Sequence, residues 1–347
     1  MIQELILKLV NGNDLTKEEM MGAFRTIMEG KATSSQMAAF LTALRVKGET
    51  VDEITSAAKI MREKMIKIDV RSGVGLDRDE INQELETILD TCGTGGSGTN
   101  TFNISTATAF VVAGCGVKVA KHGNRSASSQ CGSADVLEAL GIDITMPPPK
   151  VERCVKEIGI GFLYAPSFHP AMKNVASVRK EIGIRTIFNI LGPLCSPASA
   201  NAQVLGVYDV GLVEVIANVL KNLGTRKAFV VHGLDTIDEI SITGPTFVGE
   251  VSSSRVKVYT VRPEDFGVRV APLKEIVGGD AKTNAEIIKK VLSGERGARR
   301  DVVLINASAA LICANKAKTF KQGVKLAEKS IDSGKALEKL EKLRTFK

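Results

Sequence analysis

The stretch DTCGTGGSGTNTFNIST, from Asp90 to Thr106, decides how the rest of the chain is interpreted. It contains four glycines and many hydroxyl and amide side chains, but no lysine or arginine. Glycine at this density lets the backbone turn tightly and approach a ligand closely. A strand pattern over Thr87–Asp90 precedes the glycines, and a helix pattern over Ser105–Ala113 follows them. We therefore predict a glycine-rich loop between a strand and a helix.

The same alternation of strand and helix continues along the chain. Further strands are predicted at Gly116–Ala120, Gly161–Tyr164, Gln203–Tyr208, Lys227–Val231 and Asp301–Ile305. Helical stretches separate them, which implies a central, largely parallel sheet flanked by helices. Before residue 71 only helices are expected, because capping-box sequences at Thr16, Thr33 and Thr50 each precede apolar residues three or four apart. The predicted fold class is α/β, with a small all-helical N-terminal domain before a larger α/β domain.

Composition restricts the class of partner. The 347 residues carry a formal net charge of +7, which suggests an anionic partner. Lysines and arginines are scattered and aromatics make up only 4% of the chain, so small anionic substrates fit at least as well as nucleic acid. The six cysteines contain no C-x-x-C pair, which argues against a metal knuckle or a redox motif. With no leader pattern and no run of about 18 apolar residues, a cytoplasmic protein is expected.

The residues from Gly93 to Gly98 match G-x-G-x-x-G, so a dinucleotide site has to be considered. That fingerprint requires an acidic residue about twenty positions later, to bind the ribose of NAD. The next strand instead ends in Lys121-His122-Gly123-Asn124-Arg125, whose cations suit the 2′-phosphate of NADP or another phosphate. A P-loop is excluded because no Gly-Lys-Ser/Thr follows the glycines.

Two neighbouring loops together predict a site for a polyanion. Asn103, Ser105 and Thr106 begin the helix after the glycines, where free N–H groups and the helix dipole favour an anion. Ser105 or Asn103 is equally explained as an N-cap. The second loop adds Lys121 and Arg125, and the loops that follow neighbouring parallel strands meet at one edge of the sheet. Backbone donors from one loop and full positive charges from the other suit a phosphorylated ligand.

A third loop, HGLDTIDE from His232 to Glu239, supplies the opposite charge. Carboxylates that follow a strand are usually solvated or cap a helix. Beside a phosphate site, however, Asp238 and Glu239 suit Mg²⁺, which takes one or two carboxylates and completes its shell with water and phosphate oxygens.

Four long motifs resemble the anthranilate phosphoribosyltransferase family. They are GTGGSGTNTFNIST, KHGNRSASSQCGSADVLEALG, FHPAMKNVASVRKEIGIRTIFNILGPL and VVHGLDTIDEIS. The tail RDVVLINASAALICANKAKTFKQGVKLA is similar too, so the resemblance covers nearly the whole chain. The pyrimidine nucleoside phosphorylases resemble the chain more distantly, with the same fold and a different glycine motif.

The resemblance implies transfer of the 5-phosphoribosyl group from phosphoribosyl diphosphate to the amine of anthranilate, with release of pyrophosphate, the second step of tryptophan synthesis from chorismate. It implies Mg²⁺, about two ions per subunit, and a homodimer formed through the helical domain. Residues 1–72 with 165–185 would form the helical domain on the anthranilate side. Residues 73–164 with 186–347 would form the α/β domain that binds phosphoribosyl diphosphate, and the helical part is expected to close over it.

Site residues carry over from the family by position. For phosphoribosyl diphosphate they are Gly93, Gly96, Ser97, Thr101, Asn103, Ile104, Ser105, Thr106, Lys121, His122, Gly123, Asn124, Arg125, Ser126, Ala127, Ser128, Ser129 and Ser133. For anthranilate they are Gly93, Asn124 and Arg179, and for the metal Ser105, Asp238 and Glu239. Lys121, His122 and Arg125 are expected to catalyse by charge and position, without a covalent nucleophile. His122 and His169 are expected to position groups rather than carry protons. Without the resemblance, Arg179 would be taken as a surface cation.

Two positions depart from the family pattern. Many members carry aspartate where this chain has Ser97, and serine where it has Cys131. The missing carboxylate predicts an altered Mg²⁺ dependence, so Ser97→Asp should shift the Mg²⁺ titration of activity, and superimposable curves would contradict this. Cys131 is similar in size to serine and is expected to matter little.

Two other classes of function stay open. A nucleoside phosphorylase would use free phosphate and would not need Asp238 and Glu239. A non-catalytic homologue that binds nucleic acid would have no use for Arg179 or for the acidic pair. It would show a steep dependence of DNA affinity on salt.

Overall fold

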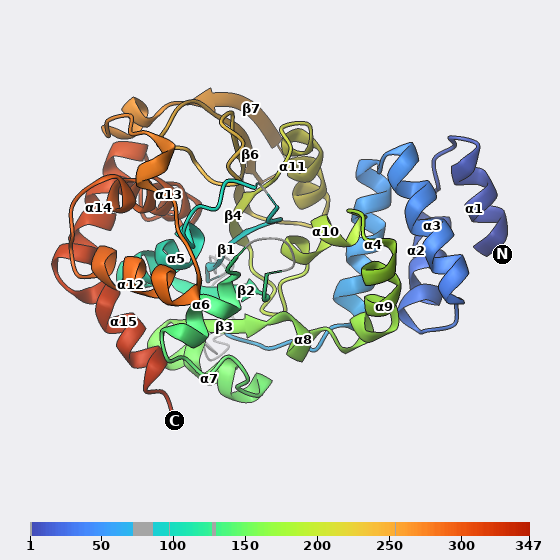
Figure 1. Cartoon of the computed structure of the whole chain (residues 1–347), viewed down its shortest axis with the longest axis horizontal. Coiled ribbons are helices and arrows are strands. Elements are labelled where there is room, and N and C mark those ends of the chain that lie inside the picture. The colour runs from blue at the N-terminus through green and yellow to red at the C-terminus, as the bar shows by residue number, and fades with distance from the viewer. Residues whose placement is uncertain (1, 72–85, 97, 127–129, 254) are drawn as a thin grey trace, which may run out of the picture.

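The computed structural model describes residues 2–71, 86–96, 98–126, 130–253 and 255–347. Its N-terminal part is a bundle of the helices α1 (Ile2–Val10), α2 (Lys17–Met28), α3 (Ser34–Lys47) and α4 (Val51–Lys64). The predicted capping boxes at Thr16, Thr33 and Thr50 are all present, with each threonine hydroxyl accepting from the N–H three residues later. These helices form the blue end of the molecule in Figure 1.

The remaining chain builds a seven-stranded sheet in the order β3-β2-β1-β4-β5-β6-β7. Its strands are β1 (Ile88–Gly93), β2 (Lys118–Gly123), β3 (Ile160–Tyr164), β4 (Ala202–Gly206), β5 (Lys227–Gly233), β6 (Thr246–Ser252) and β7 (Arg255–Val261). The first five strands are parallel, and β6 and β7 add an antiparallel hairpin at the edge. The predicted small helical domain beside a larger, largely parallel α/β domain is confirmed.

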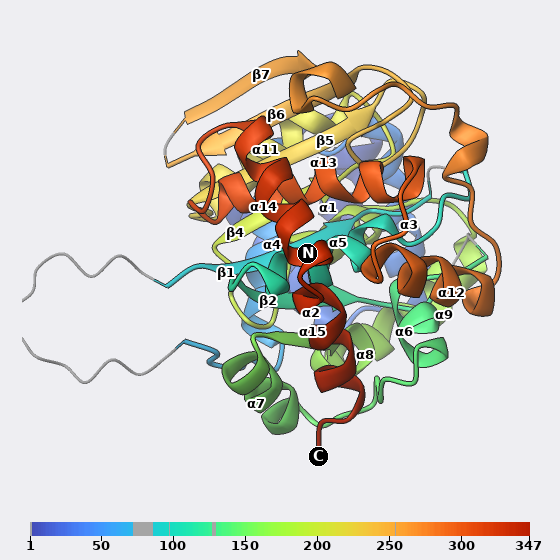
Figure 2. The same cartoon turned by 90° about the vertical axis from the view of Figure 1, so that its left-hand side faces the viewer.

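Helices cover both faces of this sheet. The helices that follow the N-terminal bundle in the chain are α5 (Ile104–Gly114), α6 (Ser133–Ala139), α7 (Pro148–Ile158), α8 (Ala165–Phe168), α9 (Lys173–Ile182), α10 (Phe188–Leu191), α11 (Leu212–Asn222), α12 (Ala281–Leu292), α13 (Ala298–Cys313), α14 (Phe320–Asp332) and α15 (Lys335–Arg344). One core joins the sheet to α5 and α12–α15, and Figure 2 shows α13, α14 and α15 in front of the strands. The second core joins the other face, through α11, to the helical bundle.

Helix α9 lies with the bundle although it is far from it in sequence. It packs against α2 and α3, and the Asn174 side chain donates to the carbonyl oxygen of Met28 at 2.8 Å. The 3₁₀ turn Pro170–Met172, with proline at its first position, leads into α9.

The strand predicted at Asp301–Ile305 is wrong, because these residues lie inside α13. Helix α13 runs through the core with almost every residue buried, so its sequence has no polar face to reveal a helical period. A short apolar run of this kind cannot be assigned from periodicity alone. The other five predicted strands correspond to β1–β5 within a few residues at each end. Among the described residues, no helix is long and apolar enough to cross a membrane.

Candidate active site

The strands β1, β4 and β5 end side by side at one edge of the sheet, called here the carboxyl edge. Gly93 of β1 is paired with Gly206 of β4, which is paired with Val231 of β5. From β1 the chain winds outward to β2 and β3, and from β4 it winds the opposite way to β5. Parallel α/β sheets bind ligands where the winding reverses, outside the carboxyl ends of the strands. The predicted glycine loop follows β1 at this point.

The glycine loop, residues 93–101, depends on backbone conformations that suit glycine. Gly95, Gly96 and Gly98 have φ angles of 66°, 81° and 75°, in the left-handed region. The N–H of Thr94 donates to the carbonyl oxygen of Gly206 at 2.9 Å, which ties the loop to β4. Ser97, and with it the predicted change in Mg²⁺ dependence, lies outside the described residues. The predicted tight, glycine-rich turn between β1 and α5 is confirmed.

Helix α5 begins without a side-chain cap. Asn103 is the N-cap residue, but its side chain makes no capping hydrogen bond. Its Nδ2 instead donates to the carbonyl oxygen of Cys131 at 3.2 Å, and its Oδ1 accepts from Asn284 Nδ2 at 2.9 Å. The side chains of Ile104 and Thr106 are buried, and their N–H groups donate to the carbonyl oxygens of Phe102 at 2.7 Å and Asn103 at 3.1 Å. The start of α5 therefore attracts an anion through its helix dipole, while the N–H groups of residues 104–106 already have acceptors within the chain.

Asp238 and Glu239 reach from the loop after β5 to the first loop and α5. Asp238 Oδ2 accepts from the N–H of Gly95 at 3.1 Å, and Glu239 Oε1 accepts from the N–H of Ser105 at 3.1 Å. Gly206 permits this approach, because a Cβ there would lie 1.6 Å from the carbonyl oxygen of Asp238. The structure therefore gathers the predicted metal ligands Ser105, Asp238 and Glu239 at the carboxyl edge.

The electrostatics of this acidic pair fit a divalent cation. Burial and the neighbouring Asp238 carboxylate raise the pKa of Glu239 to about 8. A cation held by both carboxylates would remove that cost. Among the described residues, no three His, Cys, Asp or Glu side chains cluster into a complete metal cage. Two carboxylates and a hydroxyl suit Mg²⁺, which leaves room for water and phosphate oxygens.

Lys121 is a buried cation beside this pair. Its side chain is only 3% exposed, and Nζ donates to the carbonyl oxygen of Thr91 at 2.6 Å and to Ser105 Oγ at 3.3 Å. Burial lowers its pKa, and the Asp90 carboxylate partly offsets this. The lysine is therefore fixed beside the start of α5.

Arg125 was predicted to contact phosphoribosyl diphosphate, but its side chain is paired with two carboxylates of α6. Its Nη1 lies 2.9 Å from both the Asp135 and the Glu138 carboxylates of α6, so its charge is already balanced. The other oxygen of Asp135 accepts from the N–H groups of Ser126 and Gly132, at 3.0 and 2.9 Å, which closes the second loop on itself. The predicted contacts of Ala127, Ser128 and Ser129 lie outside the described residues.

The remaining predicted residues of the second loop form its base. The carbonyl oxygen of Asn124 accepts from the N–H of Ala134 at 3.1 Å and from Ser133 Oγ at 3.4 Å. A Cβ at Gly123 would lie 2.2 Å from that Ser133 oxygen. In the first loop, Thr101 forms an isolated antiparallel bridge with Val277. In the part of the chain that the structure describes, no hydrogen bond joins Asn124 to Arg179, so the two predicted anthranilate contacts are not linked directly.

Two buried histidines connect β2 to the segment before α9. The rings of His122 and His169 lie 5.0 Å apart between centroids. Burial, and then the neighbouring His169, lower the pKa of His122 to about 3, and burial lowers the pKa of His169 to about 4. Both Nε2 atoms lack a hydrogen-bond partner within the described residues. Both rings are therefore neutral at pH 7, which favours positioning over proton transfer.

Arg179 lies on α9, and its setting differs from that of an ordinary surface cation. The side chain is half-buried, and its guanidinium carbon lies 5.4 Å from the ring centroid of Phe188. In the described part of the chain this side chain makes no hydrogen bond or salt bridge, and burial lowers its pKa. A half-buried cation without a counter-charge is costly.

Sequence reasoning missed Arg185 and Asn284. Arg185 Nη2 donates to the carbonyl oxygen of Gly96 at 2.6 Å, inside the glycine loop. Asn284 is 2% exposed and binds both Asn103 and the N–H of Gly279. Neither residue belongs to a loop that follows a strand, so no local pattern marks them as site residues. For Arg185, the family-like motif FHPAMKNVASVRKEIGIRTIF that contains it was the one available indication.

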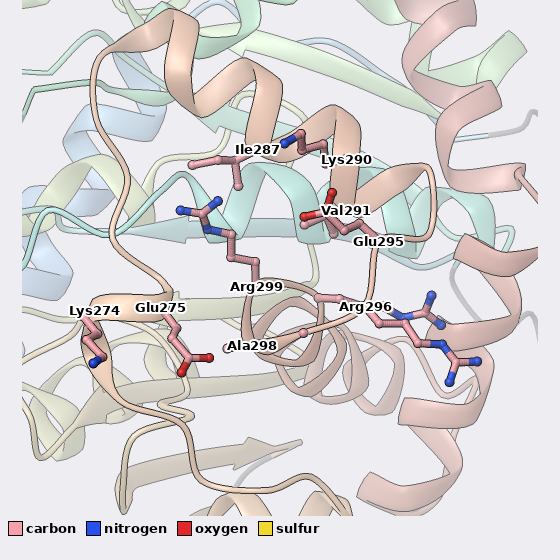
Figure 3. A pocket seen from close by; sticks show the side chains of 11 residues that line it. Lys274, Glu275, Ile287, Lys290, Val291, Glu295, Arg296, Ala298 and Arg299 are labelled. Atoms are coloured by element: carbon pink, nitrogen blue, oxygen red, sulfur yellow. The ribbon is translucent and has the colours of Figure 1, made fainter.

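A second group of cations surrounds a hollow of about 220 Å³, shown in Figure 3. Lys274, Lys290, Arg296 and Arg299 line it together with Glu275 and Glu295. Arg299 donates to the carbonyl oxygen of Val277 at 3.2 Å, so part of this charge holds backbone in place. The lining comes from the segment before α12, from α12, from the connection between α12 and α13, and from the start of α13, and it includes no predicted site residue.

Comparison with known proteins agrees with this geometry. Residues 85–337 match the α/β domain of a glycosyl transferase family, and residues 3–65 match that family's helical bundle domain. The chain is 57% identical to anthranilate phosphoribosyltransferase of Citrifermentans bemidjiense over 99% of its own length and 98% of the relative's.

Solved structures extend the likeness to three dimensions. The crystal structure of anthranilate phosphoribosyltransferase from Thermus thermophilus superimposes with a TM-score of 0.90 at 40% identity, covering 98% of each chain. The Saccharomyces cerevisiae enzyme in complex with PRPP and Mg superimposes with a TM-score of 0.85 at 31% identity, covering 98% of this chain and 96% of that one. With the strand-end loops, the acidic pair and the helical bundle in place, the chain belongs to the anthranilate phosphoribosyltransferase family.

Proposed function

We propose that the protein transfers the 5-phosphoribosyl group of phosphoribosyl diphosphate to the amine of anthranilate, giving N-(5-phosphoribosyl)anthranilate and pyrophosphate, in a Mg²⁺-dependent step of tryptophan synthesis. The observation that carries this proposal is the convergence of the glycine loop, Lys121 and the acidic pair Asp238-Glu239 at the carboxyl edge. It is joined by Arg179 on α9, whose side chain has no polar partner among the described residues.

The glycine loop would supply N–H donors for the phosphoribosyl diphosphate, and the dipole of α5 would add favourable charge at its start. Lys121 adds a fixed positive charge, and buried cations in a water-poor site stabilise developing negative charge strongly. Ser105, Asp238 and Glu239 would hold Mg²⁺, which neutralises charge on the leaving diphosphate when bound. Arg125 is paired with α6 here, so its predicted contact with the substrate requires exchange of the Asp135 and Glu138 partners.

Arg179 is proposed to bind the carboxylate of anthranilate. An arginine and a carboxylate form a charge-assisted, bidentate pair, and the half-buried guanidinium has no competing partner in the described residues. The aromatic amine already carries its lone pair, so no strong base is needed. His122 and His169, neutral at pH 7, would orient groups, and the rate would come from position and charge.

We also propose the finer features of the assembly. Leu7, Val10 and Val46 are 62%, 67% and 82% exposed on α1 and α3, which favours a homodimer formed through the helical part. The packing of α9 on α2 and α3 supports a helical domain of residues 1–72 with 165–185, which would close over residues 73–164 with 186–347. None of the six cysteines, all of which are described, forms a disulfide, as is usual in the cytoplasm, where we place the protein. About two Mg²⁺ ions per subunit are proposed.

The test follows anthranilate fluorescence with the purified full chain. Loss of the signal is expected only when protein, Mg²⁺ and phosphoribosyl diphosphate are all present. Omission of each component in turn is the control. A flat trace with all three present would contradict the proposed reaction.

A further inference from the structure

Arg185 holds the glycine loop from the side of α9. Its Nη2 donates to the carbonyl oxygen of Gly96 at 2.6 Å, and its guanidinium carbon lies 4.1 Å from the ring centroid of Tyr208. We propose that Arg185 is a positioning residue that keeps the glycine loop in the shape that binds phosphoribosyl diphosphate. This inference rests on the proposed function and adds a residue to its machinery.

The contacts of Arg185 form a closed ring around the loop. The Arg185 guanidinium contacts Gly96 on one side and the aromatic ring of Tyr208 on the other. The N–H of Tyr208 donates to Thr94 Oγ1 at 3.1 Å, so Arg185 and Tyr208 together link two residues of the glycine loop. Gly95 lies between the anchored residues Thr94 and Gly96, and glycines have many accessible conformations when nothing restrains them. These contacts therefore reduce the conformational freedom of the glycine loop at its most flexible residues.

The shape of Gly96 is matched to this contact. A Cβ at that position would lie 2.8 Å from Arg185 Nη2, so the guanidinium occupies the space of the absent side chain. The planar guanidinium donates at its edge while its face covers the Tyr208 ring. A lysine would retain the charge but lose both the stacking and the fork of donors.

Arg185 also complements the second anchor of the loop. The N–H of Gly95 donates to Asp238 Oδ2, and Asp238 is a proposed ligand of Mg²⁺. The bond from Arg185 to Gly96 involves no proposed metal ligand. It can therefore hold the loop whether or not Asp238 turns to a metal ion.

The position of Arg185 predicts which substrate it affects. Helix α9, which carries Arg179, ends at Ile182 and is capped by Gly183 with a φ angle of 66°, and Arg185 follows on the connection back to the sheet. Its contacts in the described residues are with the glycine loop and Tyr208. A change at Arg185 should therefore weaken phosphoribosyl diphosphate binding and leave anthranilate binding alone.

The test measures both KM values for Arg185→Ala in the full chain with Mg²⁺. The KM for phosphoribosyl diphosphate should rise about 10-fold, with the KM for anthranilate changed by less than about twofold. Arg185→Lys should give an intermediate value. Arg153→Ala is the matched control, because Arg153 also stacks on an aromatic ring, at 5.3 Å from Phe346, and pairs with Glu157 on α7. It should leave both KM values unchanged.

Calorimetric titration with phosphoribosyl diphosphate and Mg²⁺, without anthranilate, provides a readout that needs no turnover. An unchanged affinity in Arg185→Ala would overturn the inference. Equal rises in both KM values together with a lower melting temperature would overturn it too, since they indicate structural support only. If the native chain binds phosphoribosyl diphosphate but consumes no anthranilate, the proposed function fails. The calorimetric comparison then still decides the role of Arg185.

Discussion

The carboxyl edge and helix α9 both carry proposed substrate contacts, but they hold their charges differently. At the carboxyl edge each charged group already has partners: Lys121 bonds Ser105, Glu239 accepts from Ser105, and Asp238 accepts from Gly95. On α9, Arg179 is half-buried and its side chain has no polar partner in the described residues. The first region is assembled before any ligand arrives, which lowers the cost of binding. The second has one group whose charge is left for a ligand to balance.

The largest expected effect comes from removing charge at the carboxyl edge while its hydrogen bonds are kept. Asp238→Asn and Glu239→Gln retain an oxygen that can accept from Gly95 or Ser105, but they lose the charge that a cation requires. Turnover should fall about 100-fold or more, and the Mg²⁺ concentration for half-maximal rate should rise. Glu264→Gln, a change of an exposed acid on another surface, is the control. Normal turnover in both variants would show that the pair has no part in the reaction.

A smaller effect is expected when the carboxyl edge is distorted without changing any charge. Gly206→Ala places a Cβ 1.6 Å from the carbonyl oxygen of Asp238, so β4 and the acidic loop must separate. We expect a loss of about 2–4 kcal/mol in the free energy of unfolding, with a lower rate. Gly244→Ala is the matched control, because a Cβ there meets no atom within 4 Å. Denaturant unfolding of the two variants provides the comparison, and equal midpoints would contradict the close approach.

The contact between the two regions should respond to pH. The pKa of His122 is lowered to about 3 and that of His169 to about 4, against about 6.5 for an unfolded histidine. The unfolded chain therefore binds protons more tightly, so the stabilisation is complete above pH 6.5 and is lost as the pH falls toward 4. Each histidine should cost about 2 kcal/mol of unfolding free energy at pH 5 relative to pH 7. His169→Gln should reduce the pH dependence of the unfolding free energy measured with denaturant. An unaltered pH profile would show that other groups cause the loss of stability at low pH.

The carboxyl edge could be predicted from the sequence because its signals are local. Glycines that need positive φ, such as Gly95 and Gly96, and carboxylates that directly follow a strand are visible as short patterns. The capping boxes that begin α2, α3 and α4 are equally local, and they were confirmed.

Features that depend on tertiary packing could not be predicted. Residues 301–305 belong to a helix buried on all sides, so their pattern has no helical period. The pairing of Arg125 with α6 and the contact of Arg185 with Gly96 join segments 10 to 89 residues apart. The role of Arg179 came only from the family resemblance, because a lone arginine in a charged helix has no local signature.

The most direct test is whether α9 and the carboxyl edge bind different substrates. It measures the KM for anthranilate and the KM for phosphoribosyl diphosphate in Arg179→Ala, with Arg153→Ala as the control. If α9 binds the carboxylate of anthranilate and the carboxyl edge binds phosphoribosyl diphosphate, the KM for anthranilate should rise about 10- to 100-fold. The KM for phosphoribosyl diphosphate should change by less than about twofold. A rise confined to phosphoribosyl diphosphate, or no change in either value, would contradict the account.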